Sequence, residues 1–127
     1  MPVTQPLPVH QFVHDLFKAV DSLDARMVAP FIADDVHLQF GSAEPVDGKA
    51  DFLASSRAFS ESIAGLRHEI VQIWEPEPDT AIAVLQVHYR RHDGSEITLP
   101  CCNTFRLRDG LVTDYRVYMD INPVYAS

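Results

Sequence analysis

Six histidines are the side chains of this sequence best suited to proton transfer or metal binding. They are His10, His14, His37, His68, His88 and His92. An unperturbed imidazole titrates near about pH 6.5, which suits an acid or base working at neutral pH. His14 lies just beyond the apolar arc of a predicted helix, and we take it as a candidate catalytic acid or base. His10 and His14 have chelating spacing, but no HExxH motif accompanies them, so we expect no metal and no cofactor.

Two adjacent cysteines, Cys101 and Cys102, offer a second kind of chemistry. Neighbouring cysteines rarely form a disulfide, and two thiols alone do not complete a zinc site. A nucleophilic Cys101 needs an activating base, and the sequence places none beside it. We therefore expect Cys101 to be a small, packed side chain.

The composition restricts the class of partner. The chain has 127 residues, of which 46% are hydrophobic, and a net charge of −8. An acidic chain repels phosphate backbones, so neither nucleic acid nor an anionic membrane is an expected partner. No apolar run approaches the roughly 20 residues of a membrane span. The N-terminus lacks the basic and apolar regions of a signal peptide, so we expect a cytoplasmic protein.

The elements that must position these groups follow from periodicity. Residues 1–8 contain three prolines and are predicted to be an extended arm before a single domain at 9–127. Helical spacing predicts helices at about 9–20, 23–32 (irregular at Pro30) and 49–64. Alternation predicts strands at about 36–40, 66–75, 80–91, 96–108 and 111–120, with a turn at 33–35 and a loop at 41–48. This order predicts an α+β fold, a curved antiparallel sheet wrapped around three N-terminal helices, as a cone with an internal pocket.

The last three strands predict which side chains face that pocket. Loops of three residues, 92–94 and 108–110, place the odd-numbered residues from Ala83 to Met119 on one apolar face and leave the other face largely polar. Loops of two residues mix the two sets, which burial energetics disfavours. The predicted ligand-binding residues are Phe17, Phe40, Phe59, Leu85, Val87, Tyr89, Cys101, Tyr115, Val117 and Met119.

Asn103 is the polar side chain that stands out on this apolar face. A buried amide without hydrogen bonds costs about 1–3 kcal/mol, so it needs partners. One possibility is an internal bond to Tyr89, or to Tyr115 directly opposite; the other is donation to a ligand carbonyl or to an oxyanion. Asn103 is therefore the second candidate catalytic residue. A packed core with no cavity is the alternative to both.

Two segments carry a resemblance to a known family. Phe31-Ile32-Ala33-Asp34-Asp35-Val36, after two helices, and the C-terminal stretch DGLVTDYRVYMDINPVY (109–125) resemble the SnoaL-like, nuclear transport factor 2-like superfamily with the ketosteroid isomerase-like fold. The resemblance covers about residues 10–125. It implies a curved sheet that cradles three helices around a deep pocket, and dimers formed through the sheet. Members include isomerases, polyketide cyclases, dehydratases, epoxide hydrolases and non-catalytic modules.

The chain departs from the catalytic patterns of two groups in that superfamily. Where ketosteroid isomerases carry a general-base Asp, the matching residue is Phe40, and the first helix has no Tyr. Asn103 matches their oxyanion-hole Asp and can still donate a hydrogen bond. Arg91-His92-Asp93 resembles part of the limonene-type epoxide hydrolase set, but Val117 replaces its second Asp, and Asp93 before Gly94 is typical of a turn.

Three functions remain open from the sequence. The first is a cofactor-independent isomerase, cyclase or dehydratase acting on a small, apolar molecule with a carbonyl group. The second is a protein that binds such a molecule without catalysis. The third is an assembly module, in which a homodimer forms through the polar sheet face. An ionisable group near Asn103 would favour the enzyme.

Overall fold

The computed structural model describes residues 8–126. Its elements are α1 (Val9–Asp21), α2 (Ala25–Val28), the short 3-10 helix η1 (Ala29–Phe31), β1 (Ile32–Phe40), β2 (Val46–Asp47), α3 (Lys49–Glu61), β3 (Gly65–Trp74), β4 (Thr80–Arg90), β5 (Glu96–Arg108), β6 (Leu111–Tyr118) and α4 (Asn122–Tyr125). Of the predicted arm at 1–8, only Pro8 is among the described residues, where it precedes α1. The irregularity predicted at Pro30 is confirmed as the change from α2 to η1.

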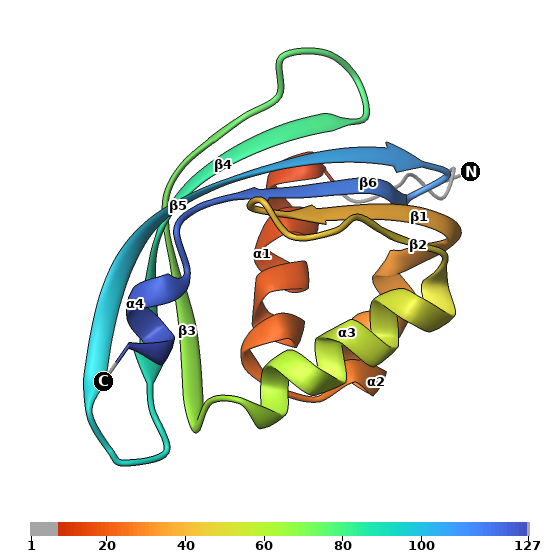
Figure 1. Cartoon of the computed structure of the whole chain (residues 1–127). Coiled ribbons are helices and arrows are strands. Elements are labelled where there is room, and N and C mark those ends of the chain that lie inside the picture. The colour runs from red at the N-terminus through yellow and green to blue at the C-terminus, as the bar shows by residue number, and fades with distance from the viewer. Residues whose placement is uncertain (1–7, 127) are drawn as a thin grey trace.

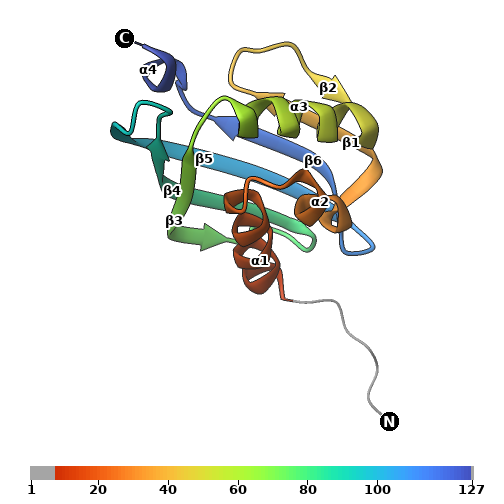
Figure 2. The same cartoon turned by 90° about the horizontal axis from the view of Figure 1, so that it is seen from below.

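The strands form a single sheet of six strands in the order β2-β1-β6-β5-β4-β3. The sheet bends strongly, and α1, α2 and α3 lie on its concave side (Figure 1). Seen from below, α1 and α3 cross the same face of the sheet (Figure 2). The predicted α+β class, with a curved sheet wrapped around helices, is confirmed.

The N-terminal part of the sheet differs from the prediction. β1 pairs with β6 in parallel, whereas the prediction was a wholly antiparallel sheet. No hairpin joins these two strands, so their relative direction is not set by a tight turn. The predicted turn at Ala33–Asp35 belongs to β1, where the pairing with β6 is irregular between Ile32 and His37. The Arg108 guanidinium holds this segment, since Nη2 donates to Asp35 Oδ1 at 2.7 Å. The short β2 and α4 were not predicted.

The predicted register is confirmed between β4 and β5, where Ala83 pairs with Asn103 and Leu85 with Cys101. Between β5 and β6 it is wrong by two residues, because Asn103 faces Val117 and Phe105 faces Tyr115. The turn itself has two residues, Asp109 and Gly110, and a nearby irregularity restores the alternation. As a result Val112, and not Leu111 or Thr113, takes the buried position.

The apolar arc of α1 packs into the core as its spacing predicts. Phe12, Val13, Leu16 and Phe17 are all buried, and Leu16 is fully inaccessible to solvent. This burial holds α1 against β3 and β4 and so fixes the position of its last residue, Asp21. Within residues 8–126, no helix has the length and apolar character needed to cross a membrane.

Candidate functional site

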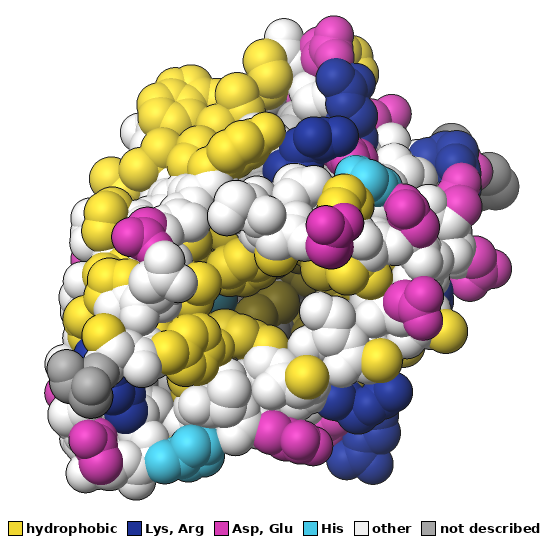
Figure 3. Space-filling model, in the orientation of Figure 1, with side chains coloured by type: hydrophobic (Ala, Val, Ile, Leu, Met, Phe, Trp, Pro, Cys, Tyr) yellow, Lys and Arg dark blue, Asp and Glu magenta, His cyan; other side chains and the backbone are white. Residues whose placement is uncertain are grey.

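A cavity of about 90 Å³ lies between α3 and the concave face of the sheet. Figure 3 shows a hollow with hydrophobic walls on this side of the molecule. The volume is below the roughly 300–1,000 Å³ of pockets for drug-sized ligands, so it suits a small molecule. Aliphatic and aromatic side chains dominate the lining, which consists of Val20, Val28, Leu38, Phe40, Phe52, Ser55, Ser56, Phe59, His68, Tyr89, Cys101, Asn103, Tyr115, Val117 and Met119.

Most of the predicted ligand-binding residues line this cavity. Asn103 lies there together with Phe40, Phe59, Tyr89, Cys101, Tyr115, Val117 and Met119. Phe17, Leu85 and Val87 do not, and this part of the prediction is corrected. Leu85 and Val87 face the concave side as expected, but α1 covers this part of the sheet. Phe17, on α1, packs into the same core, where each of the three is 0–2% exposed.

The Asn103 amide faces the cavity through its nitrogen. Asn103 is 1% exposed, and its Oδ1 accepts a hydrogen bond from the Cys101 thiol at 3.1 Å. Burial raises the pKa of the Cys101 thiol to about 12, so the sulfur keeps its proton and acts as the donor. Among the described residues, every fully enclosed side-chain nitrogen or oxygen has a partner, yet none bonds to Asn103 Nδ2. The nitrogen must therefore reach the open space and can donate to a ligand.

The internal Asn–Tyr bond considered from the sequence is not formed. Tyr89 donates instead to the Met119 sulfur at 3.4 Å. The Tyr115 hydroxyl makes no hydrogen bond to any residue from 8 to 126, although Tyr115 is only 6% exposed. Burial, followed by the nearby Cys101 and Asp21, raises the pKa of Tyr115 above its ordinary value. Tyr115 therefore stays protonated and is a second neutral donor in the wall.

His68 is the histidine among the described residues of the cavity wall, and Asp21 fixes its orientation. His68 Nδ1 lies 2.5 Å from Asp21 Oδ1, and the other carboxylate oxygen accepts from the His68 backbone N–H at 2.9 Å. A carboxylate can only accept, so Nδ1 carries a proton and Nε2 keeps its lone pair in the neutral ring. Nε2 has no hydrogen-bond partner within the described part of the chain. This is the arrangement of an oriented general base.

A chain of aromatic contacts connects His68 to Tyr115. The His68 ring stacks on Phe17 with centroids 4.6 Å apart, and Phe17 meets Phe105 at 5.8 Å. Phe105 in turn contacts Tyr115 at 4.7 Å. Phe17, predicted to touch the ligand, thus supports the imidazole from behind. The continuous packing leaves little freedom to the ring of His68 or to that of Tyr115.

His14, the predicted acid or base, is exposed on the outside of α1 and does not line the cavity. The helix turns Phe17 toward the sheet, and His14 lies outside that arc. His68 and Asp21 were not predicted as site residues. His68 shares one face of β3 with the partly buried Leu66 and Ile70. An imidazole on an otherwise apolar strand face could have indicated a site residue. Nothing in the sequence linked it to Asp21.

The segment Arg91-His92-Asp93 is used for structure. The Arg91 guanidinium donates to the carbonyl oxygens of Pro123 and Val124, at 2.6 and 2.8 Å, and so holds α4. Asp93 accepts from the Ser95 backbone at 2.9 Å, as expected of a turn residue. These structural bonds engage Arg91 and Asp93, the two residues that resemble part of the catalytic set of limonene-type epoxide hydrolases.

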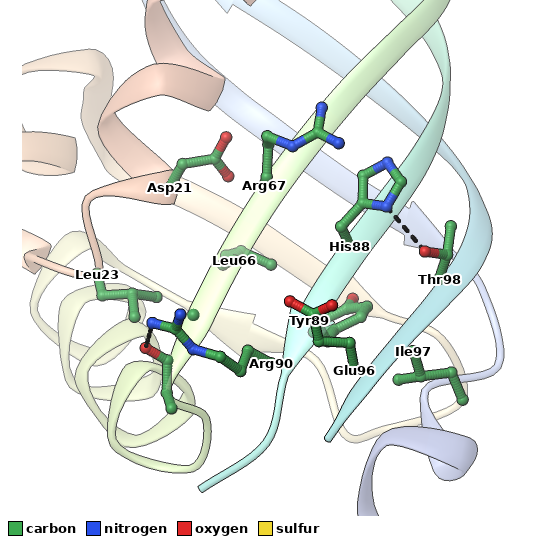
Figure 4. A pocket seen from close by; sticks show the side chains of 12 residues that line it. Asp21, Leu23, Leu66, Arg67, His88, Tyr89, Arg90, Glu96, Ile97 and Thr98 are labelled. Atoms are coloured by element: carbon green, nitrogen blue, oxygen red, sulfur yellow. Dashed lines mark hydrogen bonds between the residues drawn. The ribbon is translucent and has the colours of Figure 1, made fainter. Parts of the chain in front are cut away.

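A larger groove of about 510 Å³ runs from the end of α1 across the ends of β3, β4 and β5. Figure 4 shows Arg67, His88 and Arg90 along it, with Asp21 and Leu23 at its edge. His88 is engaged at both nitrogens, by Thr98 and Glu69, each at 2.8 Å. Its imidazole therefore has no nitrogen left for proton transfer. The smaller cavity, where His68 and Asn103 meet an apolar wall, is the stronger candidate.

Comparisons with known proteins agree with this architecture. A NTF2-like protein of unknown function from Burkholderia pseudomallei is 18% identical, with a TM-score of 0.80 over 92% of this chain and 97% of that one. A candidate SnoaL-like polyketide cyclase from Jannaschia sp. is 17% identical, with a TM-score of 0.81 over 98% and 95%. An LEH-like epoxide hydrolase from M. tuberculosis is 16% identical, with a TM-score of 0.76 over 91% and 84%.

Likenesses at this level of identity establish the fold. No curated protein matches the sequence itself. The model of the SnoaL-like domain, however, matches residues 13–115. That range includes most of α1, the whole of β3 to β5, and both His68 and Asn103. The chain belongs to the SnoaL-like domain family.

Proposed function

We propose that the protein is a cofactor-independent acid–base enzyme that acts on a small, neutral, apolar molecule with a carbonyl group. The observation that carries the proposal is the His68–Asp21 pair, with Nδ1 and Oδ1 2.5 Å apart, on the wall of a cavity that also contains Asn103. An apolar cavity with a few polar groups is the usual form of a small-molecule site. None of its lining residues within 8–126 is Lys, Arg, Asp or Glu, so a charged ligand meets no counter-ion from this part of the chain.

The proposed chemistry follows from the tautomer of His68 that its hydrogen bond to Asp21 selects. In this mechanism His68, in its neutral form, removes a proton from the carbon next to the carbonyl through Nε2. The electron pair of the broken C–H bond moves into an enolate, whose oxygen accepts hydrogen bonds from Asn103 Nδ2 and the Tyr115 hydroxyl. Asp21 stabilises the imidazolium that results. His68 then returns the proton to another carbon, which isomerises the ligand, or to a departing hydroxyl group, which leaves as water.

The apolar walls contribute to this reaction by excluding water. Hydrogen bonds from Asn103 and Tyr115 to an enolate oxygen are stronger in such surroundings than in bulk water. Raised by burial, the pKa of Tyr115 keeps its hydroxyl a donor across the physiological range. This arrangement favours isomerisation, cyclisation or dehydration over ester hydrolysis, since no nucleophilic side chain with a lowered pKa accompanies His68 among the described residues of the cavity.

Hydrogen exchange at a model ketone tests the proposal without knowledge of the natural substrate. Cyclohexanone is incubated with the protein in D2O, and loss of the α-proton signal is followed by NMR. We expect exchange above the buffer rate, its loss in His68→Gln, and an unchanged rate in the matched control His14→Gln, whose imidazole is exposed. Full activity in His68→Gln overturns the proposal. Binding of cyclohexanone without any exchange favours a protein that only binds the ligand.

The homodimer is a separate proposal, supported by the outer face of the sheet. This face carries exposed Trp74 and Tyr118, 47% and 54% accessible, although the sequence predicted it to be largely polar. Register places Ile82, Val84 and Cys102 between them, because Trp74 pairs with Ile82, Val84 with Cys102 and Cys102 with Tyr118. Contiguous exposed apolar surface of this kind is typical of an interaction site. A second copy that presents the same face would cover it.

A further inference from the structure

Helix α3 forms the wall of the cavity that lies across from Asn103 and Tyr115. Phe52 and Phe59 on this helix are the anchors. The Phe52 ring lies 5.9 Å from Tyr115, and the Phe59 ring lies 6.4 Å from Tyr89 and 6.2 Å from Phe40. Residues seven apart in a helix are about 10 Å apart along its axis, so α3 spans the cavity from one tyrosine to the other.

Two consecutive serines, Ser55 and Ser56, occupy the middle of that span, and both line the cavity. Serine is a modest helix former, because its hydroxyl competes for backbone groups. Residues three and four positions from Phe52 share its face, and an apolar helix stripe normally continues there with a large side chain. The two serines instead leave space and bring hydroxyl groups to this wall.

These hydroxyls have no partner among the residues that the structure describes. The comparable serines at loop and helix ends are bonded: Ser22 Oγ donates to the Ala19 carbonyl at 2.6 Å, and Ser62 Oγ to the Phe59 carbonyl at 2.6 Å. No such bond forms for Ser55 or Ser56, although both are partly buried. Their donor and acceptor capacity is thus available to whatever fills the cavity.

We propose that Ser55 and Ser56 form a second polar subsite, which selects ligands with a hydroxyl group at the end remote from the carbonyl. This inference rests on the proposed function, in which Asn103 and Tyr115 hold the carbonyl oxygen. The substrate class becomes a small, neutral hydroxy-carbonyl compound. It meets donors on the sheet at one end and serine hydroxyls on α3 at the other, with apolar walls between them.

The test compares 4-hydroxycyclohexanone with 4-methylcyclohexanone, which has the same shape but no remote hydroxyl. Dissociation constants are measured by ligand-observed NMR for the wild type, the double variant Ser55→Ala/Ser56→Ala, and the control Ser60→Ala. Ser60 lies on the same helix and is partly buried, but it does not line the cavity. Alanine is a better helix former than serine, so the variants keep α3.

We expect the preference for the hydroxy compound to fall about three- to tenfold in the double variant, as for the loss of one hydrogen bond, and to be unchanged in Ser60→Ala. Asn103→Leu should weaken both ketones equally and leave their ratio as it was. A ratio that stays within about twofold of the wild type in the double variant overturns the subsite alone. If neither ketone binds the wild type, the carbonyl site and the subsite are both wrong.

Discussion

The His68 imidazole donates a hydrogen bond to the Asp21 carboxylate, and their side chains, 10% and 22% accessible, form the least exposed contact between a basic and an acidic side chain among the described residues. They are 47 positions apart in the chain and come from different elements, β3 and the last residue of α1. Asp21 receives both the ring and the backbone N–H of His68. The pair therefore joins the first helix to the sheet and orients the imidazole at the same time.

Asp21→Asn should show whether Asp21 sets the tautomer and orientation of the His68 ring. An amide can donate to Nδ1, which favours the tautomer with the proton on Nε2, and that tautomer cannot act as a base in the cavity. We expect the rate of cyclohexanone exchange to fall at least about tenfold, with the helix content unchanged by circular dichroism. Asp15→Asn is the control, since Asp15 lies on the same helix and accepts a bond from Gln11 at 2.8 Å. Equal rates in both variants would show that Asp21 has no part in orienting His68.

Asn103→Leu removes the amide from the cavity wall and keeps an apolar side chain in its place. We expect the fold to persist and the dissociation constant for cyclohexanone to rise about three- to tenfold, the usual effect of losing one hydrogen bond to the ligand. Titration calorimetry or NMR measures it. Thr104→Val serves as the control, because Thr104 is the next residue on β5 and points to the other face. Unchanged affinity in Asn103→Leu means that the amide is purely structural.

The Cys101 thiol should make the protein less stable in alkali. Burial raises the pKa of this thiol to about 12. At a pH below the ordinary thiol pKa, the folded and the unfolded chain both hold the proton, and the thiol's contribution to stability is complete. As the pH rises, the unfolded chain loses its proton first. The free energy of unfolding therefore falls by up to about 1.4 kcal/mol per pH unit until the folded thiol also ionises.

Urea unfolding between pH 8 and pH 11 measures this slope (an interval of about three units). Tyr89 and Tyr115 also have raised pKa values and contribute in every variant. Cys101→Val should consequently show a shallower decline than the wild type, whereas Cys102→Val, on the opposite face, should keep the steep one. If the two valine variants decline alike, Cys101 is not the source.

Tyr118→Glu should disrupt the proposed homodimer. The substitution places a charge in the exposed apolar strip of the outer sheet face, where a buried unpaired carboxylate is costly. Sedimentation equilibrium should give twice the chain mass of 14.3 kDa for the wild type and the single chain mass for the variant. Met27→Glu, at a residue of α2 that is also 54% exposed, should remain dimeric. A wild-type protein that sediments as one chain rules out the dimer.

Local sequence patterns predicted most of the fold. Alternation along β4 and β5 identified the concave face, because each strand side chain takes one of two directions and burial selects the apolar set. The same pattern placed Asn103, Cys101 and Val117 on the cavity side, and helical spacing placed Phe12, Val13, Leu16 and Phe17 in the core. These features depend on neighbours within a few residues, so the sequence by itself determined them.

Only the tertiary structure decided which inward side chains border open space and which polar groups meet. Leu85 and Val87 share the concave face with Tyr89, but α1 covers the first two and leaves the cavity beside the third. Because of the irregularity between β5 and β6, Tyr115 pairs with Phe105 and not, as predicted, with Asn103. The amide oxygen of Asn103 accepts a hydrogen bond from the Cys101 thiol instead. His68 met Asp21 because the curvature of the sheet and the packing of α1 bring distant segments together, and local periodicity carries no information about such distances.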